Sequence, residues 1–217
     1  MFLSLFDPDN KFWRFMGKIV DVFLISFLWL LGCIPLITIG ASTSALYQFT
    51  LRQVDDTEST VLRGYFRAFR QNFGKATLVW MLEVLCGAVL AFDLWACLQM
   101  KNTVGNIGFF LFISLSVMYL LVIQYLLPIT ALFDFPLKKI IGDSFKMALG
   151  NLPSTVTCLM SFVLAVWLTS FFWIGFPVFF GLAAFASSYV LRGVLKRYMP
   201  EHEEDEEEEE VSDEEEL

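Results

Sequence analysis

This chain contains a single histidine and no recognisable catalytic motif. The single histidine, His202, lies in an acidic C-terminal segment, and no GxSxG, HExxH or GxxxxGK[ST] pattern occurs. The four cysteines form no CxxC pair and all stand in apolar segments: Cys33, Cys86, Cys97 and Cys158. Small apolar residues of the interior are their expected role, rather than a disulfide or metal site. We therefore expect no enzyme, no metal ligands and no cofactor.

Charged residues are also scarce until the last part of the chain. Hydrophobic residues make up 57% of the 217 positions, whereas a soluble domain has about 45–50% apolar residues. Of the 23 acidic residues, 13 fall within 201–217, which leaves 23 − 13 = 10 acids against 15 bases before that segment. The net charge of −8 therefore hides a basic body, as expected beside an anionic membrane surface. The expected partner is the lipid bilayer, with no nucleic acid.

Long apolar segments predict an all-α protein, a polytopic transmembrane helical bundle over residues 1–198. A helix needs about 20 residues to cross the hydrocarbon core. The expected spans are at about 10–33, 35–51, 76–99, 107–132, 152–173 and 175–191. The second is short and polar, so a re-entrant hairpin over 35–51 is an alternative to a sixth full crossing.

The basic residues give this bundle an orientation. Six crossings place 14 of the 15 Lys and Arg residues on the inner side and only Lys101 outside. A single crossing within 19–51 would reduce the ratio to 11 against 4. Because loops on the cytoplasmic side are enriched in Lys and Arg, we predict a multi-pass plasma-membrane protein with both termini cytoplasmic.

Two basic segments between spans predict amphipathic helices on the cytoplasmic side. In residues 61–73 the apolar residues Leu62, Phe66, Phe69 and Phe73 recur at helical spacing. Such a helix can anchor the protein to anionic headgroups, or it can dock another membrane subunit. A second segment, 145–153, matches residues 66–74 at an offset of 79 residues. The candidate docking residues of the two segments are Arg63, Arg67, Arg70 and Lys146.

Two acidic residues, Glu83 and Asp93, fall inside the predicted third span. They lie about 15 Å apart along the helix axis and about 80° apart around it. A carboxyl group inside the membrane is costly, so it is a functional candidate by default. The alternative for Glu83 is a buried carboxyl group bonded to a neighbouring helix, and Asp93 lies nearer the outer interface.

Residues 199–217 form the acidic tail. The tail has no apolar periodicity, and its composition predicts a disordered, solubilising segment. Contact with basic partners and weak binding of divalent cations are the alternatives.

One stretch resembles a known family. Thr-Ile-Gly-Ala-Ser-Thr at 38–43, followed by Ala-Leu-Tyr at 45–47, is similar to the YesL-like family of bacterial integral membrane proteins. Residues 17–30 and 66–73 fit it as well, whereas the acidic tail departs from it. The resemblance supplies no catalytic residues.

The resemblance implies an accessory or regulatory component associated with carbohydrate uptake, with carbohydrate ABC importer subunits as partners. One alternative is a small carrier or channel that uses Glu83, which would require a homo-oligomer. Another is a structural or stress-related membrane protein.

Overall fold

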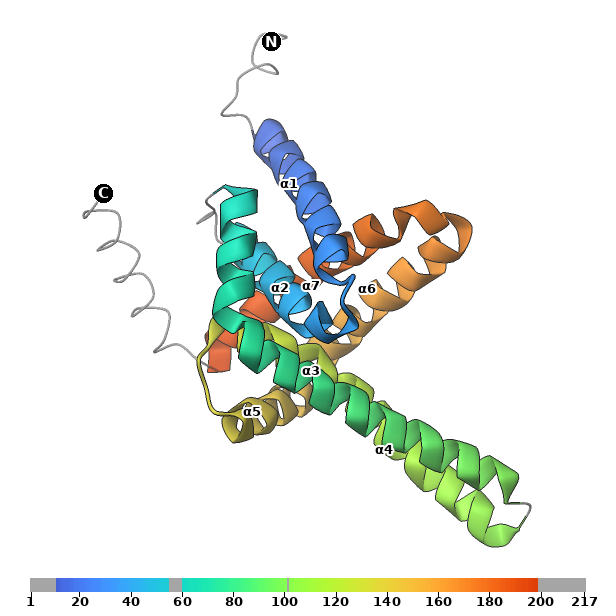
Figure 1. Cartoon of the computed structure of the whole chain (residues 1–217). Coiled ribbons are helices and arrows are strands. Elements are labelled where there is room, and N and C mark those ends of the chain that lie inside the picture. The colour runs from blue at the N-terminus through green and yellow to red at the C-terminus, as the bar shows by residue number, and fades with distance from the viewer. Residues whose placement is uncertain (1–10, 55–59, 101, 199–217) are drawn as a thin grey trace.

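The computed structural model describes residues 11–54, 60–100 and 102–198, with side chains from Met16 onward, so the acidic tail lies outside the described residues. This part of the chain is almost entirely helical and contains no strand (Figure 1). The helices are α1 (Lys11–Gly32), α2 (Ile39–Val54), α3 (Val61–Gln99), α4 (Thr103–Leu132), α5 (Leu137–Gly150), α6 (Leu152–Phe171) and α7 (Phe176–Tyr198), with short 3-10 turns at Leu36–Thr38 and Trp173–Gly175.

Four helical segments of the described chain are long and apolar enough to cross a membrane. They are α3, α4, α6 and Trp173–Tyr198, which joins a 3-10 turn to α7. These segments correspond to the third to sixth predicted spans. The first two predicted spans correspond to α1 and to α2, and a count of six crossings remains a prediction. With 16 residues, α2 is about 24 Å long, less than the hydrocarbon thickness of about 30 Å.

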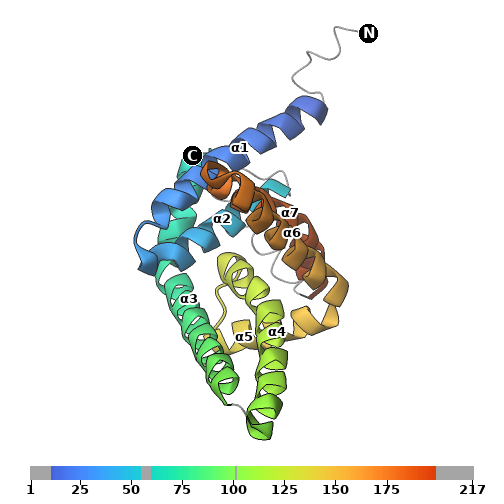
Figure 2. The same ribbon diagram turned by 90° about the vertical axis from the view of Figure 1, so that its right-hand side faces the viewer.

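Two helical hairpins extend from a common body. Helices α3 and α4 form one hairpin, α6 and α7 form the other, and the two diverge (Figures 1 and 2). Large apolar side chains such as Phe92, Trp95 and Phe110 are exposed on the first hairpin. Acyl chains are as apolar as these side chains, so a bilayer is the environment in which such a surface is stable.

Helix α2 is the centre of the body. Thirteen of its 16 residues are buried, and it packs against α1, α3, α4 and α7. At Gly40 there is no room for a side chain, because the carbonyl group of Ala76 and the Cβ of Trp80 lie against its backbone. Small residues permit this close approach of two helices. The small and polar residues of the second predicted span therefore face protein.

Hydroxyl groups join α2 to its neighbours. Ser42 Oγ donates to the carbonyl oxygen of Trp29 at 2.8 Å and lies 2.8 Å from Tyr65 Oη. The Trp29 indole donates to Thr43 Oγ1 at 3.1 Å and stacks on Phe180 at 4.2 Å. These contacts connect α1, α2, α3 and α7 by the interhelical hydrogen bonding and close packing that hold membrane bundles together.

The two basic segments are both helical, but they differ in form. Residues 61–73 are continuous with the third predicted span, because α3 is a single helix of 39 residues. At about 58 Å it is far longer than the hydrocarbon core, and Figure 1 shows it changing direction between its cyan first part and its green remainder. Helix α5 is separate. The position of both segments at a membrane surface remains a prediction.

Candidate functional site

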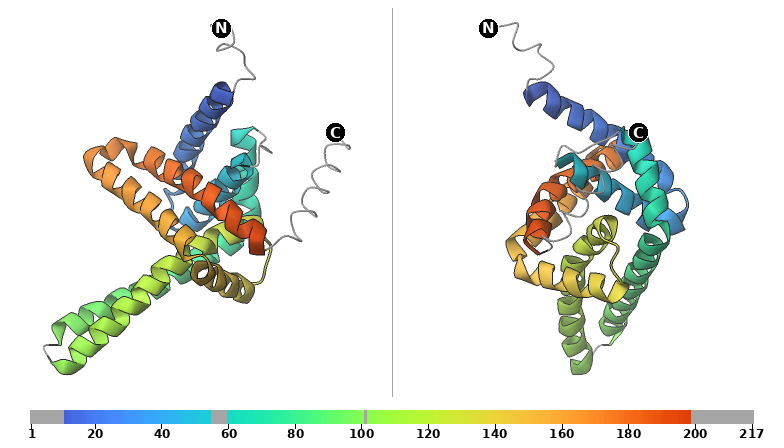
Figure 3. Two further views of the ribbon diagram at one scale, coloured as in Figure 1. Left: turned by 180° about the vertical axis from the view of Figure 1, so that it is seen from behind. Right: turned by 90° about the vertical axis from the view of Figure 1, so that its left-hand side faces the viewer.

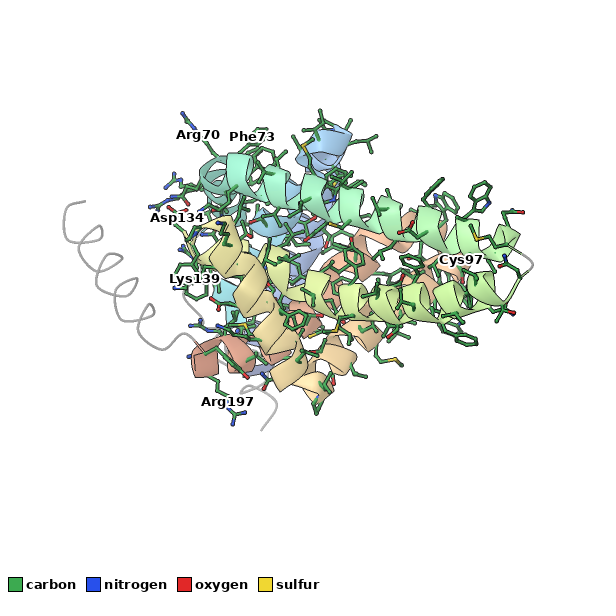
Figure 4. The ribbon with its side chains drawn as sticks, turned by 90° about the horizontal axis from the view of Figure 1, so that it is seen from below. Arg70, Phe73, Cys97, Asp134, Lys139 and Arg197 are labelled. Atoms are coloured by element: carbon green, nitrogen blue, oxygen red, sulfur yellow. The ribbon has the colours of Figure 1, made fainter. Side chains whose placement is uncertain are left out.

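The exposed bases gather at one end of the molecule. Figure 4 shows Arg70, Lys139 and Arg197 at the same end, with Cys97 at the far end of the α3–α4 hairpin. Seen from behind, the first part of α3, α5 and the end of α7 again lie away from the hairpin tips (Figure 3). We call this surface the basic face. Its exposed bases are Arg63, Arg67, Arg70, Lys138, Lys139, Lys146, Lys196 and Arg197.

The predicted docking residues of α3 are displayed on a firmly held helix. Tyr65 is 2% exposed and shares its hydroxyl hydrogen bond with Ser42, and Ala68 is 4% exposed. On the outer side, Arg63 and Arg70 form no hydrogen bond or ion pair with any other residue in the described ranges. Arg67 is exposed and has an interaction of its own.

Several apolar side chains of this segment are turned outward. The side chains of Leu62 and Phe66 are 57% and 59% exposed, and Phe73 is also exposed. The helix is held in the bundle by Tyr65 and Ala68, so these larger side chains stand beside the arginines. Exposed apolar side chains beside cations suit either a headgroup layer or a docked protein.

Helix α5 presents the fourth predicted docking residue. Its buried residues Ile140, Ser144, Met147 and Ala148 follow one helical face. Lys146 is exposed and lies 3.4 Å from Asp143, one turn away in the same helix. The structure therefore places Lys146 on a different element from the three arginines, within the same basic face.

Sequence reasoning missed the contacts of the loop between α4 and α5. Lys75 of α3 forms an ion pair with Asp134, which lies in the loop between α4 and α5. In the same loop Phe133 and Phe135 are buried and stack at 5.3 Å, and Lys139 Nζ lies 3.4 Å above the Phe135 ring. Favourable cation–π geometry puts the cation within about 6 Å of the ring centroid. The sequence feature that could have drawn attention to this loop is an acid between two phenylalanines, directly after the fourth predicted span.

An amide side chain links this region to α2. Asn72 Nδ2 donates to Gln48 Oε1 at 3.0 Å and to the carbonyl oxygen of Ala131 at 3.3 Å. One side chain of α3 therefore contacts both α2 and the last turn of α4. The Lys75–Asp134 pair is a second polar link, between α3 and the loop that follows α4.

Glu83 lies near polar groups of two other helices, Tyr119 of α4 and Tyr47 of α2. Its Oε1 is buried and has no hydrogen-bond partner, as is true of Thr77 Oγ1 and Gln124 Oε1. Tyr119 Oη donates to the backbone carbonyl oxygen of Glu83 at 2.6 Å, and Tyr47 of α2 lies within electrostatic range of Glu83. Among the described residues no three His, Cys, Asp or Glu side chains come together as metal ligands. The arrangement offers a carboxyl group that could exchange a proton.

Asp93 is not part of this polar group. It is half-buried on the α3–α4 hairpin and forms no hydrogen bond or ion pair with other residues in the described ranges. About 15 Å of helix separates it from Glu83. The two acids therefore do not form a paired-carboxylate site.

Comparisons with known proteins agree with the resemblance over the central elements. Residues 22–94, from within α1 to within α3, match the family model described as "Protein of unknown function, DUF624". The "Uncharacterized protein YesL" of Bacillus subtilis (strain 168) is 23% identical over 164 residues, which cover 73% of this chain and 76% of that protein. No solved structure matches. The family model covers Gly40, Arg63 and Glu83, and together with the similarity to the B. subtilis protein it supports the resemblance to the YesL-like family.

Proposed function

We propose that this protein acts by contact, as an accessory or regulatory membrane component in carbohydrate uptake. The observation that carries the proposal is the exposure of Arg63 and Arg70, without partners among the described residues, on a helix anchored through Tyr65. The association with carbohydrate uptake comes from the family resemblance. The plasma membrane and a cytoplasmic position of the basic face come from the distribution of charges.

The geometry supports docking because the charges are presented by a rigid element. Each side chain that becomes ordered on binding costs about 0.5–1.5 kcal/mol, and a flexible loop adds to this cost. A surface that is already formed on a helix avoids part of it. Tyr65 and Asn72 hold the first part of α3 from one side, while Leu62 and Phe66 offer apolar contact area between the arginines. A partner with an acidic, partly apolar surface fits this arrangement.

Charge reversal of the three arginines tests the proposal. We expect the triple replacement Arg63→Glu, Arg67→Glu and Arg70→Glu to abolish co-purification of sugar-importer subunits and to reduce uptake. The matched control is Lys101→Glu, a reversal on the opposite side of the predicted membrane, which should change neither. Unchanged uptake and complex formation, in cells that contain equal amounts of the variant protein, would rule the proposal out.

A second candidate is a small carrier or channel coupled to protons or cations. The buried Oε1 of Glu83, which has no hydrogen-bond partner, favours it. This function predicts pH-dependent flux in proteoliposomes that is lost in Glu83→Gln and retained in Asp93→Asn. Flux through so small a bundle also predicts a homo-oligomer, which can be measured by mass photometry. If neither contact nor flux is found, the structural or stress-related role is favoured.

A further inference from the structure

The basic face and the acidic tail are joined in one chain. Helix α7 ends at Tyr198 with two bases in its last turn, Lys196 and Arg197. The chain then continues through 199–217, of which residues 201–217 contain 13 acids. The segment with 13 of the chain's 23 acids therefore follows directly on the face with the most exposed bases.

The exit point also lies directly beside α5. The hydroxyl group of Tyr198 lies against the backbone of Gly150, where it would meet any side chain larger than hydrogen. Gly150 is the last residue of α5, and Lys138, Lys139 and Lys146 are exposed along that helix. The tail therefore begins at one end of a row of bases.

We infer that the acidic tail, residues 201–217, binds back onto the basic face, along α5 and toward the first part of α3. In doing so it covers the same arginines and lysines that a partner or an anionic headgroup would contact. The inference rests on the proposed function in one respect, since it gives the proposed docking surface an internal competitor.

Chain length permits this contact. The 19 residues of 199–217 can extend at most about 60 Å, whereas α5, with 14 residues, is about 21 Å long. A short tether of this kind gives an effective concentration in the millimolar range, so weak individual contacts suffice. No particular tail conformation is required, because the attraction depends on charge.

Charge balance favours the tail as the occupant. Two acids of the described chain lie within or next to α5, and each is engaged: Asp134 with Lys75, and Asp143 with Lys146. Arg63, Arg70, Lys138 and Arg197 have no hydrogen-bond or ion-pair partner within the described residues. Each Lys or Arg near an anionic lipid surface is attracted to it by about 1 kcal/mol. The tail must therefore compete with anionic headgroups for the same bases.

Zero-length crosslinking with a carbodiimide tests the inference, because the reagent joins a carboxylate to an amine only when the two groups touch. The full-length protein, in nanodiscs of neutral lipid, should give crosslinks from tail glutamates to Lys138, Lys139 or Lys146. Their yield should fall at least about fivefold in ~1 M salt, where the screening length is about 3 Å. Lys101 is the internal control and should give none. Crosslinks from the tail only to its neighbour Lys196 would overturn the inference.

Two further measurements identify the occupant. A mixture of ¹⁴N- and ¹⁵N-labelled protein separates crosslinks within one chain from crosslinks between copies, and crosslinks between copies alone would contradict binding within the chain. A full-length variant with Gln and Asn in place of the tail acids should retain about two- to threefold more anionic lipid on purification. Equal lipid retention would show that headgroups, and not the tail, occupy the face. All readouts use the isolated protein, so they are independent of the uptake assay.

Discussion

Thr50 Oγ1 and Ser188 Oγ lie 2.8 Å apart, although 138 residues separate them in the chain. Both residues are completely buried, and their contact joins the central helix α2 to the last helix α7. Each hydroxyl also lies within hydrogen-bond distance of a carbonyl oxygen in the preceding turn of its own helix, and because each has a single proton, only one of them donates to a carbonyl while the other donates across the pair. The pair is one of the contacts that join the N-terminal half of the protein to its C-terminal half.

This contact can be measured with a double-mutant cycle. Thr50→Val and Ser188→Ala should each destabilise the protein, and we expect a coupling energy of about 0.5–1 kcal/mol, in the range found for interhelical hydrogen bonds in membranes. The free energy of unfolding in mixed micelles is the readout. Ser170→Ala, which removes a hydroxyl bonded only within its own helix, is the control and should show no coupling. Strict additivity of the first two changes would contradict the expected bond.

The close approach at Gly40 predicts intolerance of any side chain. Gly40→Ala places a Cβ against the Ala76 carbonyl group and the Trp80 Cβ, so α2 and α3 must separate. Overpacking of this kind costs about 1–3 kcal/mol, which thermal unfolding in detergent would detect.

The matched control for this change is Gly142→Ala in α5, where the added Cβ has open space. The same substitution should there be neutral or stabilising by up to about 1 kcal/mol, because alanine favours helix. Equal effects at the two glycines would show that the tight α2–α3 contact is not formed.

Glu83→Gln is expected to preserve or raise stability. No group donates a hydrogen bond to the buried Glu83 Oε1, so replacement by an amide loses no partner at that atom. The amide also removes the cost of placing a carboxylate in the membrane, which is about 2.5–3.5 kcal/mol at most on insertion scales. Asp93→Asn, on the exposed hairpin, serves as the comparison. A marked loss of stability in Glu83→Gln alone would mean that the carboxylate has a partner that the amide cannot satisfy.

The two polar links on the basic face should differ in strength. Asp134 is 97% exposed, so its ion pair with Lys75 should contribute less than about 1 kcal/mol, and Asp134→Asn should have a small effect. Asn72→Ala removes two partly buried hydrogen bonds and should cost about 1–3 kcal/mol. Chemical denaturation at low and high salt compares them, and the opposite order would contradict this account of the region.

The membrane orientation has a direct chemical test. In a background without the four native cysteines, Lys101→Cys should react with an impermeant thiol reagent added to intact cells, because cytoplasmic loops concentrate Lys and Arg. Gln71→Cys, beside Arg70, should react only after permeabilisation. The reverse pattern would invert the topology and place the basic face outside.

Hydropathy located four long helices well because every backbone group in a lipid-facing segment must be satisfied within its own helix. The predicted spans at 76–99 and 107–132 correspond to parts of α3 and α4, and those at 152–173 and 175–191 to α6 and α7. The basic segment at 61–73 was predicted to be helical, and it is. Its continuity with the following span was not apparent, because no local signal distinguishes one bent helix from two.

The class of the protein, an all-helical chain with apolar membrane-length segments, therefore follows from local chemistry alone. Enclosure of α2, the contact of Thr50 with Ser188 and the placement of Lys75 beside Asp134 were decided only by the tertiary structure. The physical reason is the range of the interactions. A helix satisfies its backbone within four residues, whereas the partner of a buried hydroxyl or an acid is chosen by the packing of helices that are distant in sequence.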